Sequence, residues 1–225
     1  MNKVIVFDFD GTLTKRGQNI WKLLWTKCGY TTDKNSLYAK LYVAHTIEKS
    51  ISRQEWFDLT CKAFRQKKLS YKDFYEESKK IELIDGAHEI FKSLYEKGYK
   101  LCIVSGCMKE TIEIVLGESK KYFEEIKSNE ICFDENGIIS HFIPTPYDFQ
   151  GKAIFVKEFA AKSNIKPSSI VFIGNGDNDE FAYLSGCKTI CINPDNNTDK
   201  NNKNKWHETI DEINNLNELM PKFNR

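Results

Sequence analysis

The sequence predicts an α/β fold: a Rossmann-like, doubly wound parallel sheet with a helical cap domain inserted after the first strand. Short apolar runs rich in β-branched residues recur along the chain, as is typical of strands buried on both faces. Amphipathic helical patterns separate these runs, and such alternation produces right-handed βαβ units. Between the first and second runs, however, lie roughly 70 residues that show helical patterns alone.

The elements of the sheet domain can be taken in chain order. Its strands are expected at residues 4–7, 101–104, 170–173 and 189–192. A helix is expected over 86–97, where Gly98 ends the pattern, and another over 152–163.

Three further segments have their own signatures. Residues 131–133 and 137–139 flank an Asp-Glu-Asn-Gly turn and predict a β-hairpin. The polar segment 194–205 predicts a mobile loop, and a final helix is expected near 206–220.

Residues 15–85 predict the cap, so that residues 1–14 and 86–225 form the core domain. The helices of the cap are expected near 18–28, 35–49, 53–67 and 71–80. Most of the eleven aromatic residues of the cap are expected to form its own core. The segment carries 15 Lys and Arg against 9 Asp and Glu. This surplus indicates either solvated helix faces or a surface that attracts an anionic substrate.

Composition narrows the function classes. The 225 residues have a net charge of +1, which gives no global attraction to nucleic acid or to an anionic membrane. The N-terminal apolar run is too short for a signal peptide or a membrane span. The seven cysteines form no C-x-x-C pair, which favours a reducing compartment over a disulfide framework or a zinc site. We therefore expect a cytoplasmic protein, whose oligomeric state the sequence does not indicate.

Two carboxylates follow the first strand directly, in the segment DFDGTLT. Ligands of open parallel sheets bind beyond the carboxyl ends of the strands, where Asp8 and Asp10 are expected. Paired carboxylates repel each other unless a cation or a proton lies between them, and Mg²⁺ prefers such oxygen ligands. Gly11 then permits a sharp turn and close approach of the backbone to a ligand.

Three later segments also follow strands or open helices. Ser105 and the N–H groups of Gly106 and Cys107 could bind phosphate oxygens at a helix start, although a Ser there is also a common N-cap. Lys152, which alone would be an exposed helix residue, could neutralise phosphate and hold the carboxylates apart. The segment GNGDNDE at 174–180 is typical of a metal-binding turn.

With these four segments in this order, the sequence resembles the haloacid dehalogenase superfamily of aspartate-nucleophile phosphatases, and within it the phosphoserine-phosphatase-like branch. The resemblance covers residues 3–14 and 86–193. The DxDGT element is highly specific, and Ser105, Lys152 and the 174–179 turn match the family's remaining motifs. The insert also lies where the family places its helical cap.

The resemblance implies a Mg²⁺-dependent phosphatase that hydrolyses a small phosphomonoester in two steps. Asp8 would attack phosphorus to form an aspartyl phosphate, and Asp10 would protonate the leaving alcohol and then activate water. Mg²⁺ would be held by the Asp8 carboxylate, the Asp10 backbone carbonyl and the fourth motif. The implied phosphate-binding residues are Gly11, Thr12, Ser105, Gly106 and Lys152.

The sequence departs from the family pattern in two places. Asn175 stands where the fourth motif usually has Asp, so either Asn175 ligates the metal directly or Asp179, with Asp177 as a lesser alternative, binds it through water. The Glu that phosphoserine enzymes carry soon after the first motif is missing from TKRGQNIWKLLW. Candidate substrate residues are Arg16, Trp25 and Arg53, with Lys22 and His45 as further possibilities.

Three other functions match parts of the sequence. A phosphoryl-accepting switch domain would lack the large insert and would store the phosphoryl group, which Asp10 opposes. A phosphotransferase or mutase of the same superfamily would pass the group to a second organic acceptor. A non-catalytic phosphoryl-binding module is favoured only by Asn175.

Overall fold

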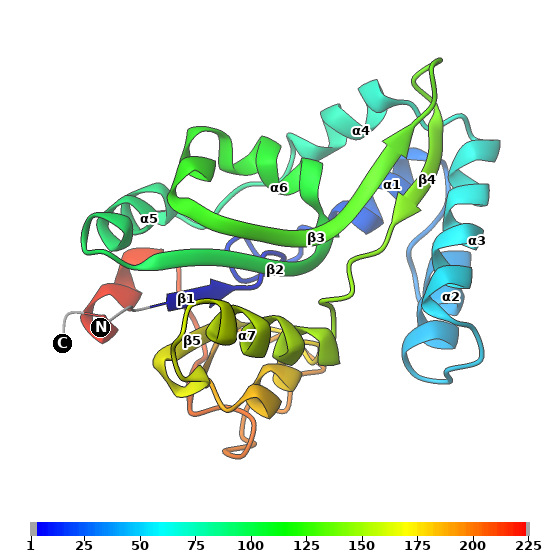
Figure 1. Ribbon diagram of the computed structural model, residues 1–225. Coiled ribbons are helices and arrows are strands. Elements are labelled where there is room, and N and C mark those ends of the chain that lie inside the picture. Colours follow the sequence, from blue (N-terminus) through cyan, green and yellow to red (C-terminus); the bar gives the residue numbers. More distant parts are fainter. Residues whose placement is uncertain (1–3, 224–225) are drawn as a thin grey trace.

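A computed structural model describes residues 4–223 as a mixed, mainly parallel sheet flanked by helices (Figure 1). Six of its strands run in parallel, and only the β3–β4 pair is antiparallel. The strand order is β4-β3-β2-β1-β5-β6-β7. The strands are β1 (Val4–Phe7), β2 (Lys100–Met108), β3 (Phe123–Phe133), β4 (Ile139–Ile143), β5 (Ile170–Gly174), β6 (Lys188–Ile192) and β7 (Glu208–Ile210).

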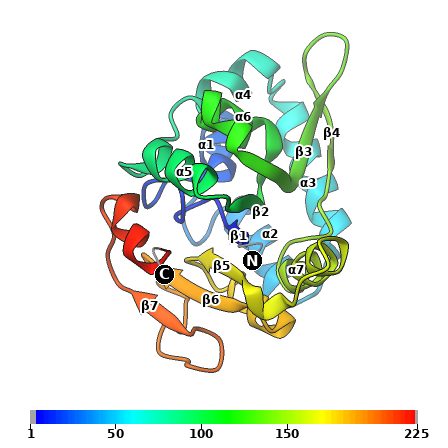
Figure 2. The same ribbon diagram turned by 60° about the vertical axis from the view of Figure 1, so that its left-hand side comes forward.

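Helices cover both faces of the sheet, as the doubly wound prediction requires (Figure 2). Alternate residues of β1 point in opposite directions, so Ile5 and Phe7 belong to one apolar cluster and Val4 and Val6 to another. The first cluster contains side chains of α5 (Ala87–Glu96), and the second contains those of α7 (Gln150–Lys162). The predicted fold class is confirmed.

Four helices lie between β1 and α5. They are α1 (Ile20–Lys27), α2 (Leu37–Thr46), α3 (Arg53–Gln66) and α4 (Tyr71–Ser78). Ser52 and Ser70 begin α3 and α4 with capping boxes, in which the side chains of Glu55 and Asp73 return to the cap N–H groups. In the described part of the chain, no helix is both long and apolar enough to span a bilayer.

The predicted hairpin forms, and it packs on the four-helix segment. The β3–β4 turn is joined to the start of α4 by hydrogen bonds from Tyr71 N to Gly137 O, at 2.8 Å, and from Ile139 N to Leu69 O, at 3.0 Å. The Phe142 ring lies 5.4 Å from that of Phe57 on α3. The helices of residues 15–85 therefore share a hydrophobic core with the hairpin and do not form that core on their own.

The two connections between the sheet and the four helices run side by side. Thr14 and Leu83 form an isolated antiparallel bridge. Lys15 N donates to Glu82 O at 3.0 Å, and Ile84 N donates to Leu13 O at 2.9 Å.

The expected helix near 206–220 is wrong. Residues 208–210 form β7 at the edge of the sheet, and a 3₁₀ helix follows at Leu216–Lys222. The Trp206 side chain is fully buried, which anchors the strand, and Pro221 is incompatible with a continued α-helix. The remaining α-helix, α6 (Lys109–Leu116), and three other 3₁₀ turns (Gly117–Tyr122, Pro167–Ser169 and Glu180–Ser185) complete the described elements.

Candidate active site

The loop after β1 presents Asp8 and Asp10 at the carboxyl edge of the sheet. Asp8 N donates to Ile173 O of β5 at 2.9 Å, which fixes the start of the loop. Gly11 has φ +76°, and a Cβ there would lie 2.5 Å from Asn175 Nδ2. Glycine thus lets this loop pass directly against the loop after β5.

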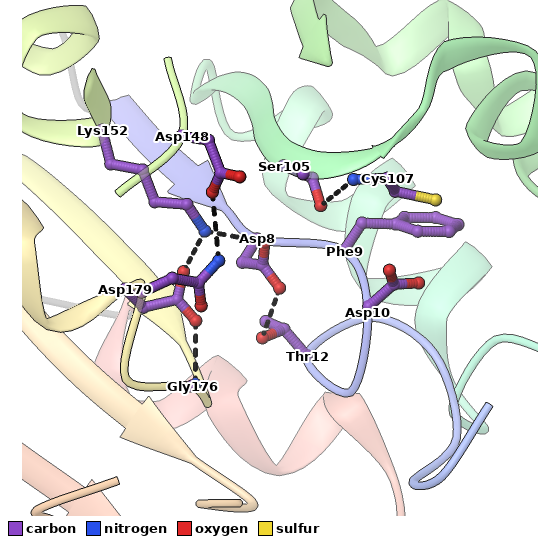
Figure 3. Close-up of polar contacts among 12 residues, drawn as sticks. Asp8, Phe9, Asp10, Thr12, Ser105, Cys107, Asp148, Lys152, Gly176 and Asp179 are labelled. Atoms are coloured by element: carbon purple, nitrogen blue, oxygen red, sulfur yellow. Dashed lines mark hydrogen bonds and ion pairs between the residues drawn. The ribbon is translucent and has the colours of Figure 1, made fainter. Parts of the chain in front are cut away.

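Lys152 lies buried between two carboxylates (Figure 3). Its Nζ donates to Asp8 Oδ1 at 2.9 Å and also contacts Asp179 Oδ1. Burial alone lowers the pKa of Lys152, but the carboxylates of Asp179 and Asp8 outweigh it and raise this pKa above its usual value. The lysine is therefore a fixed positive charge that leaves Asp8 Oδ2 free of the ammonium.

Asp179 organises the loop after β5. Its Oδ2 accepts hydrogen bonds from the N–H groups of Asn175 and Gly176, both at 2.9 Å. A Cβ at Gly174 would lie 2.4 Å from Asp179 Cγ, so only glycine fits beside this carboxylate. Both oxygens of Asp179 thus have partners within the protein.

Asn175 instead lies at the cavity beside the β1 loop. Its Oδ1 accepts from Thr12 Oγ1 at 3.2 Å, and the same hydroxyl lies 3.4 Å from Asp8 Oδ2. Asp8, Thr12 and Asn175 consequently form one cluster of oxygen atoms.

The Asp10 carboxyl is under-satisfied. Its Oδ1 is buried without a hydrogen-bond partner, and its Oδ2 accepts a long bond from Asn19 Nδ2 at 3.4 Å. Burial, reinforced by the negative charge of Asp8, raises the pKa of Asp10 to about 8. In the absence of a cation the group therefore holds a proton at neutral pH.

Ser105 lies in a different setting from the one predicted. The structure places Ser105, Gly106 and Cys107 inside β2, and α6 begins only at Lys109, without a side-chain cap. The helix-start prediction is therefore wrong. The regular pairing of β2 with β3 is interrupted between Val104 and Met108, which lets this segment turn toward the site.

A cavity of about 210 Å³ opens above these groups. It is lined by Asp8, Asp10, Ser105, Gly106 and Asn175 from the sheet domain. From the helical segment it is lined by Arg53 and His45 and by several aromatic residues. Of the candidate substrate residues, the structure thus brings Arg53 to the site, and His45 with it.

Arg16 and Trp25 are not brought to the cavity, and the expectation for both is corrected. Arg16 is exposed, donates to the Asp211 carbonyl at 2.7 Å and does not line the cavity. Trp25 is fully buried among Tyr30, Tyr38 and Phe64, since its helical spacing places it in the packed face of α1. Lys22 is exposed and does not line the cavity.

The structure adds Asp148 and Asn129, which sequence reasoning missed. Arg53 Nη2 donates to Asn129 Oδ1 at 3.1 Å and to Asp148 Oδ2 at 3.5 Å. Asn178 Nδ2 donates to Asp148 Oδ1 at 3.2 Å. Neither residue ends a recognisable strand pattern; the nearest signal for Asp148 was its place four residues before Lys152.

The donor set at the cavity fits a hard dication such as Mg²⁺. The Asp8 carboxylate and the Asn175 amide both line the cavity and supply oxygen ligands, and Thr12 Oγ1 lies within 3.4 Å of both. Among residues 4–223, no group of three or more side chains of the types His, Cys, Asp or Glu is arranged to hold a metal ion. Mg²⁺ is usually bound by one or two carboxylates and several waters.

Comparisons with known proteins give one consistent result. A family model described as haloacid dehalogenase-like hydrolase matches residues 5–180. A curated phosphoserine phosphatase of Archaeoglobus fulgidus is 34% identical over 105 residues, which are 45% of this chain and 29% of that protein. The matched stretch thus spans less than a third of the relative.

Solved structures share the fold across nearly the whole chain. A substrate-bound phosphoserine phosphatase has a TM-score of 0.76 at 17% identity, covering 99% of this chain and 98% of that one. A phospho-aspartyl intermediate analogue of phosphoserine phosphatase has a TM-score of 0.75 at 18% identity, covering 98% of both chains. A HAD family hydrolase of Salmonella enterica serovar Typhi has a TM-score of 0.74 at 16% identity, covering 96% of this chain and 70% of that one.

Proposed function

This chain belongs to the haloacid dehalogenase-like hydrolase family, and from that premise we propose that it is a Mg²⁺-dependent phosphatase of a small phosphomonoester. One observation carries the proposal. The buried Lys152 holds one oxygen of Asp8 and leaves the other facing the cavity, beside the protonatable Asp10.

In this mechanism Asp8 Oδ2 is the nucleophile. Its lone pair attacks phosphorus, the bond to the leaving oxygen breaks, and an aspartyl phosphate forms. Asp10 supplies its proton to the leaving alkoxide. The resulting carboxylate then removes a proton from the water that hydrolyses the aspartyl phosphate.

Other groups position the phosphoryl oxygens. The Ser105 hydroxyl and the Gly106 N–H are the proposed donors, with Lys152 as the fixed positive charge. The N–H groups of Gly11 and Thr12, which the sequence also suggested, already donate to Thr14 Oγ1 at 2.9 Å and to the Phe9 carbonyl at 3.3 Å. Trp21 Nε1 and Asn129 Nδ2 both donate to the Gly106 carbonyl, at 3.1 and 2.6 Å, which orients that peptide.

Mg²⁺ would be held by the Asp8 carboxylate, the Asp10 backbone carbonyl and Asn175. Asn175 is proposed over Asp179 as the direct ligand because Asp179 is already engaged by Lys152 and by two N–H groups. When bound, the metal neutralises charge on the phosphate and the carboxylates.

Phosphate release from a panel of phosphomonoesters, with Mg²⁺ and with EDTA, tests the function. We expect turnover that needs the metal and falls by at least about a thousandfold in Asp8→Asn. Asp58→Asn, the same change at an exposed position on α3, should keep wild-type turnover. Undiminished turnover in Asp8→Asn would disprove the proposed nucleophile, and release that requires an added alcohol acceptor would identify a phosphotransferase.

A further inference from the structure

Asn175 lies between two glycines, so the local sequence does little to fix the direction of its side chain. Gly174 ends β5 and Gly176 follows Asn175, and glycine adopts more backbone conformations than any other residue. A side chain that holds a metal ion needs a fixed direction, which neighbouring groups usually supply through hydrogen bonds. The surroundings of Asn175 must therefore hold its backbone in place.

The Asn175–Gly176 peptide is held at both of its polar groups. Its N–H, from Gly176, donates to Asp179 Oδ2 at 2.9 Å (Figure 3). Its carbonyl, from Asn175, accepts from Asp195 N at 3.0 Å and lies 2.7 Å from Thr198 Oγ1. The two groups at the carbonyl both come from the connection between β6 and β7 (Figure 2).

The Thr198 hydroxyl has one hydrogen and two acceptors within reach. Its oxygen lies 2.8 Å from Asp195 Oδ1 and 2.7 Å from the Asn175 carbonyl. The Asp195 oxygen already accepts from the N–H groups of Asn197 and Thr198, at 2.9 and 3.0 Å. The Asn175 carbonyl has one other donor and is the nearer acceptor, so we assign the hydroxyl hydrogen to it.

Glu180 anchors the segment 195–205, on which the Thr198 hydroxyl lies. The Glu180 side chain is buried, and its Oε1 accepts from Asp199 N at 2.9 Å. Its Oε2 accepts from Lys205 Nζ. Thr189 Oγ1 of β6 donates to the Lys205 carbonyl at 2.6 Å. The segment is thus attached to the sheet domain by contacts of its own, which do not involve the loop carbonyl.

We propose that Thr198 is a positioning residue for Asn175. Its hydroxyl holds the Asn175 carbonyl, which fixes the Asn175–Gly176 peptide and with it the direction of the side chain proposed to hold Mg²⁺. Thr198 does not line the cavity, so it acts through Asn175 and not on the substrate. This inference rests on the proposed function, and it adds a residue that the metal does not touch.

Metal binding in the absence of substrate provides the test. Mn²⁺ prefers the same oxygen ligands as Mg²⁺, and the electron paramagnetic resonance signal of the free ion gives its dissociation constant. Thr198→Val removes the hydroxyl and keeps the shape of the side chain, and it should raise the Mn²⁺ dissociation constant about tenfold or more. Thr198→Ser keeps the hydroxyl and should bind Mn²⁺ like the wild type.

Thr209→Val is the matched control. Thr209 Oγ1 donates to the Lys200 carbonyl at 2.9 Å, so the control removes the same kind of hydrogen bond from the same segment. Both valine variants should lower the urea midpoint by similar amounts, but Thr209→Val should leave the Mn²⁺ dissociation constant unchanged. An equal rise of that constant in both variants would show general loosening of the segment and would overturn the role of Thr198.

Asn175→Ala separates this inference from the function on which it rests. If Thr198 acts through Asn175, Thr198→Val should not further weaken the Mn²⁺ binding of Asn175→Ala, whereas independent effects would add and would overturn the inference. Weaker binding in Asn175→Ala with wild-type binding in Thr198→Val would overturn the inference and leave the proposed function standing. Wild-type binding in Asn175→Ala would overturn both the inference and the assignment of Asn175 to the metal.

Discussion

At the scale of single residues, Lys152 is the group on which the two acidic loops depend. Its ammonium is fully buried and is shared by Asp8 and Asp179, which come from different strand ends. Removing one member of a buried ionic cluster leaves the charge of the other members uncompensated. This lowers the free energy of unfolding more than replacing the whole cluster by apolar residues would.

Lys152→Met should therefore reduce the free energy of unfolding by about 3–5 kcal/mol, measured by urea denaturation. Lys157→Met removes an exposed charge from the same helix and should change it by no more than about 0.5 kcal/mol. A Lys152 variant as stable as the control would show that the carboxylates do not need the ammonium. Activity should be lost in Lys152→Met alone.

Asp10 predicts a pH dependence of stability. Its pKa of about 8 in the folded, metal-free protein lies above the 3.8 of an ordinary Asp. The folded state thus binds the proton more tightly, so this group favours folding at low pH and loses that contribution as pH rises through about 8.

Urea midpoints of the protein in EDTA should consequently fall as the pH rises from 3.8 to about 8, the two pKa values of Asp10. They should fall less steeply in Asp10→Asn. Mg²⁺ should also flatten the dependence because a nearby dication lowers the pKa of the carboxyl. Parallel curves for wild type and Asp10→Asn would contradict the assignment.

At the scale of elements, the approach of the β1 loop to the β5 loop can be tested with two glycines. Gly11 and Gly29 have φ of +76° and +79°, so alanine strains the backbone at both. A Cβ at Gly11 would meet Asn175, whereas a Cβ at Gly29 would meet nothing within 4 Å.

Gly29→Ala should cost about 1–2 kcal/mol of stability and leave Mg²⁺-dependent turnover unchanged. Gly11→Ala should cost more and should raise the Mg²⁺ concentration needed for half-maximal turnover, because Asn175 must move. Metal titrations of turnover check this. The same half-maximal Mg²⁺ concentration in both variants would contradict a role for Asn175 in metal binding.

Elements with strong local patterns could be predicted from the sequence, and those set by tertiary contacts could not. The apolar run at 4–7 and the helical spacing of 86–97 each match an observed element. The strand at 208–210 exists because β6 offers an edge and Trp206 is buried, and neither fact is visible in local periodicity.

The same distinction applies to the candidate site. Asp8, Asp10 and Asn175 are adjacent to strand ends, so the topology of a parallel sheet suffices to predict that they meet. Arg16 and Trp25 were proposed because they are near Asp10 in the sequence. Their positions depend instead on the directions of their side chains, Trp25 on α1 and Arg16 on the connection that precedes it.

At the scale of the whole molecule, the four-helix segment is closed over the cavity in this structure. Arg53 reaches Asn129 and Asp148, and Trp21 donates to the Gly106 carbonyl. The insert leaves the sheet domain near residues 14–17 and rejoins it near residues 83–86, where Thr14 and Leu83 pair. We propose these two connections as the hinge. Opening would separate Arg53 and Trp21 from their partners and admit substrate.

Acrylamide quenching of tryptophan fluorescence can detect this opening. Trp21 and Trp56 line the cavity, whereas Trp25 and Trp206 are fully buried elsewhere. Arg53→Met should favour the open state and increase quenching, and Mg²⁺ with orthovanadate should reverse the increase. Arg65→Met, on the same helix and outside the cavity, should quench like the wild type. If quenching is the same in all variants with and without orthovanadate, the four-helix segment is rigid, and substrate must enter the cavity without movement at the hinge.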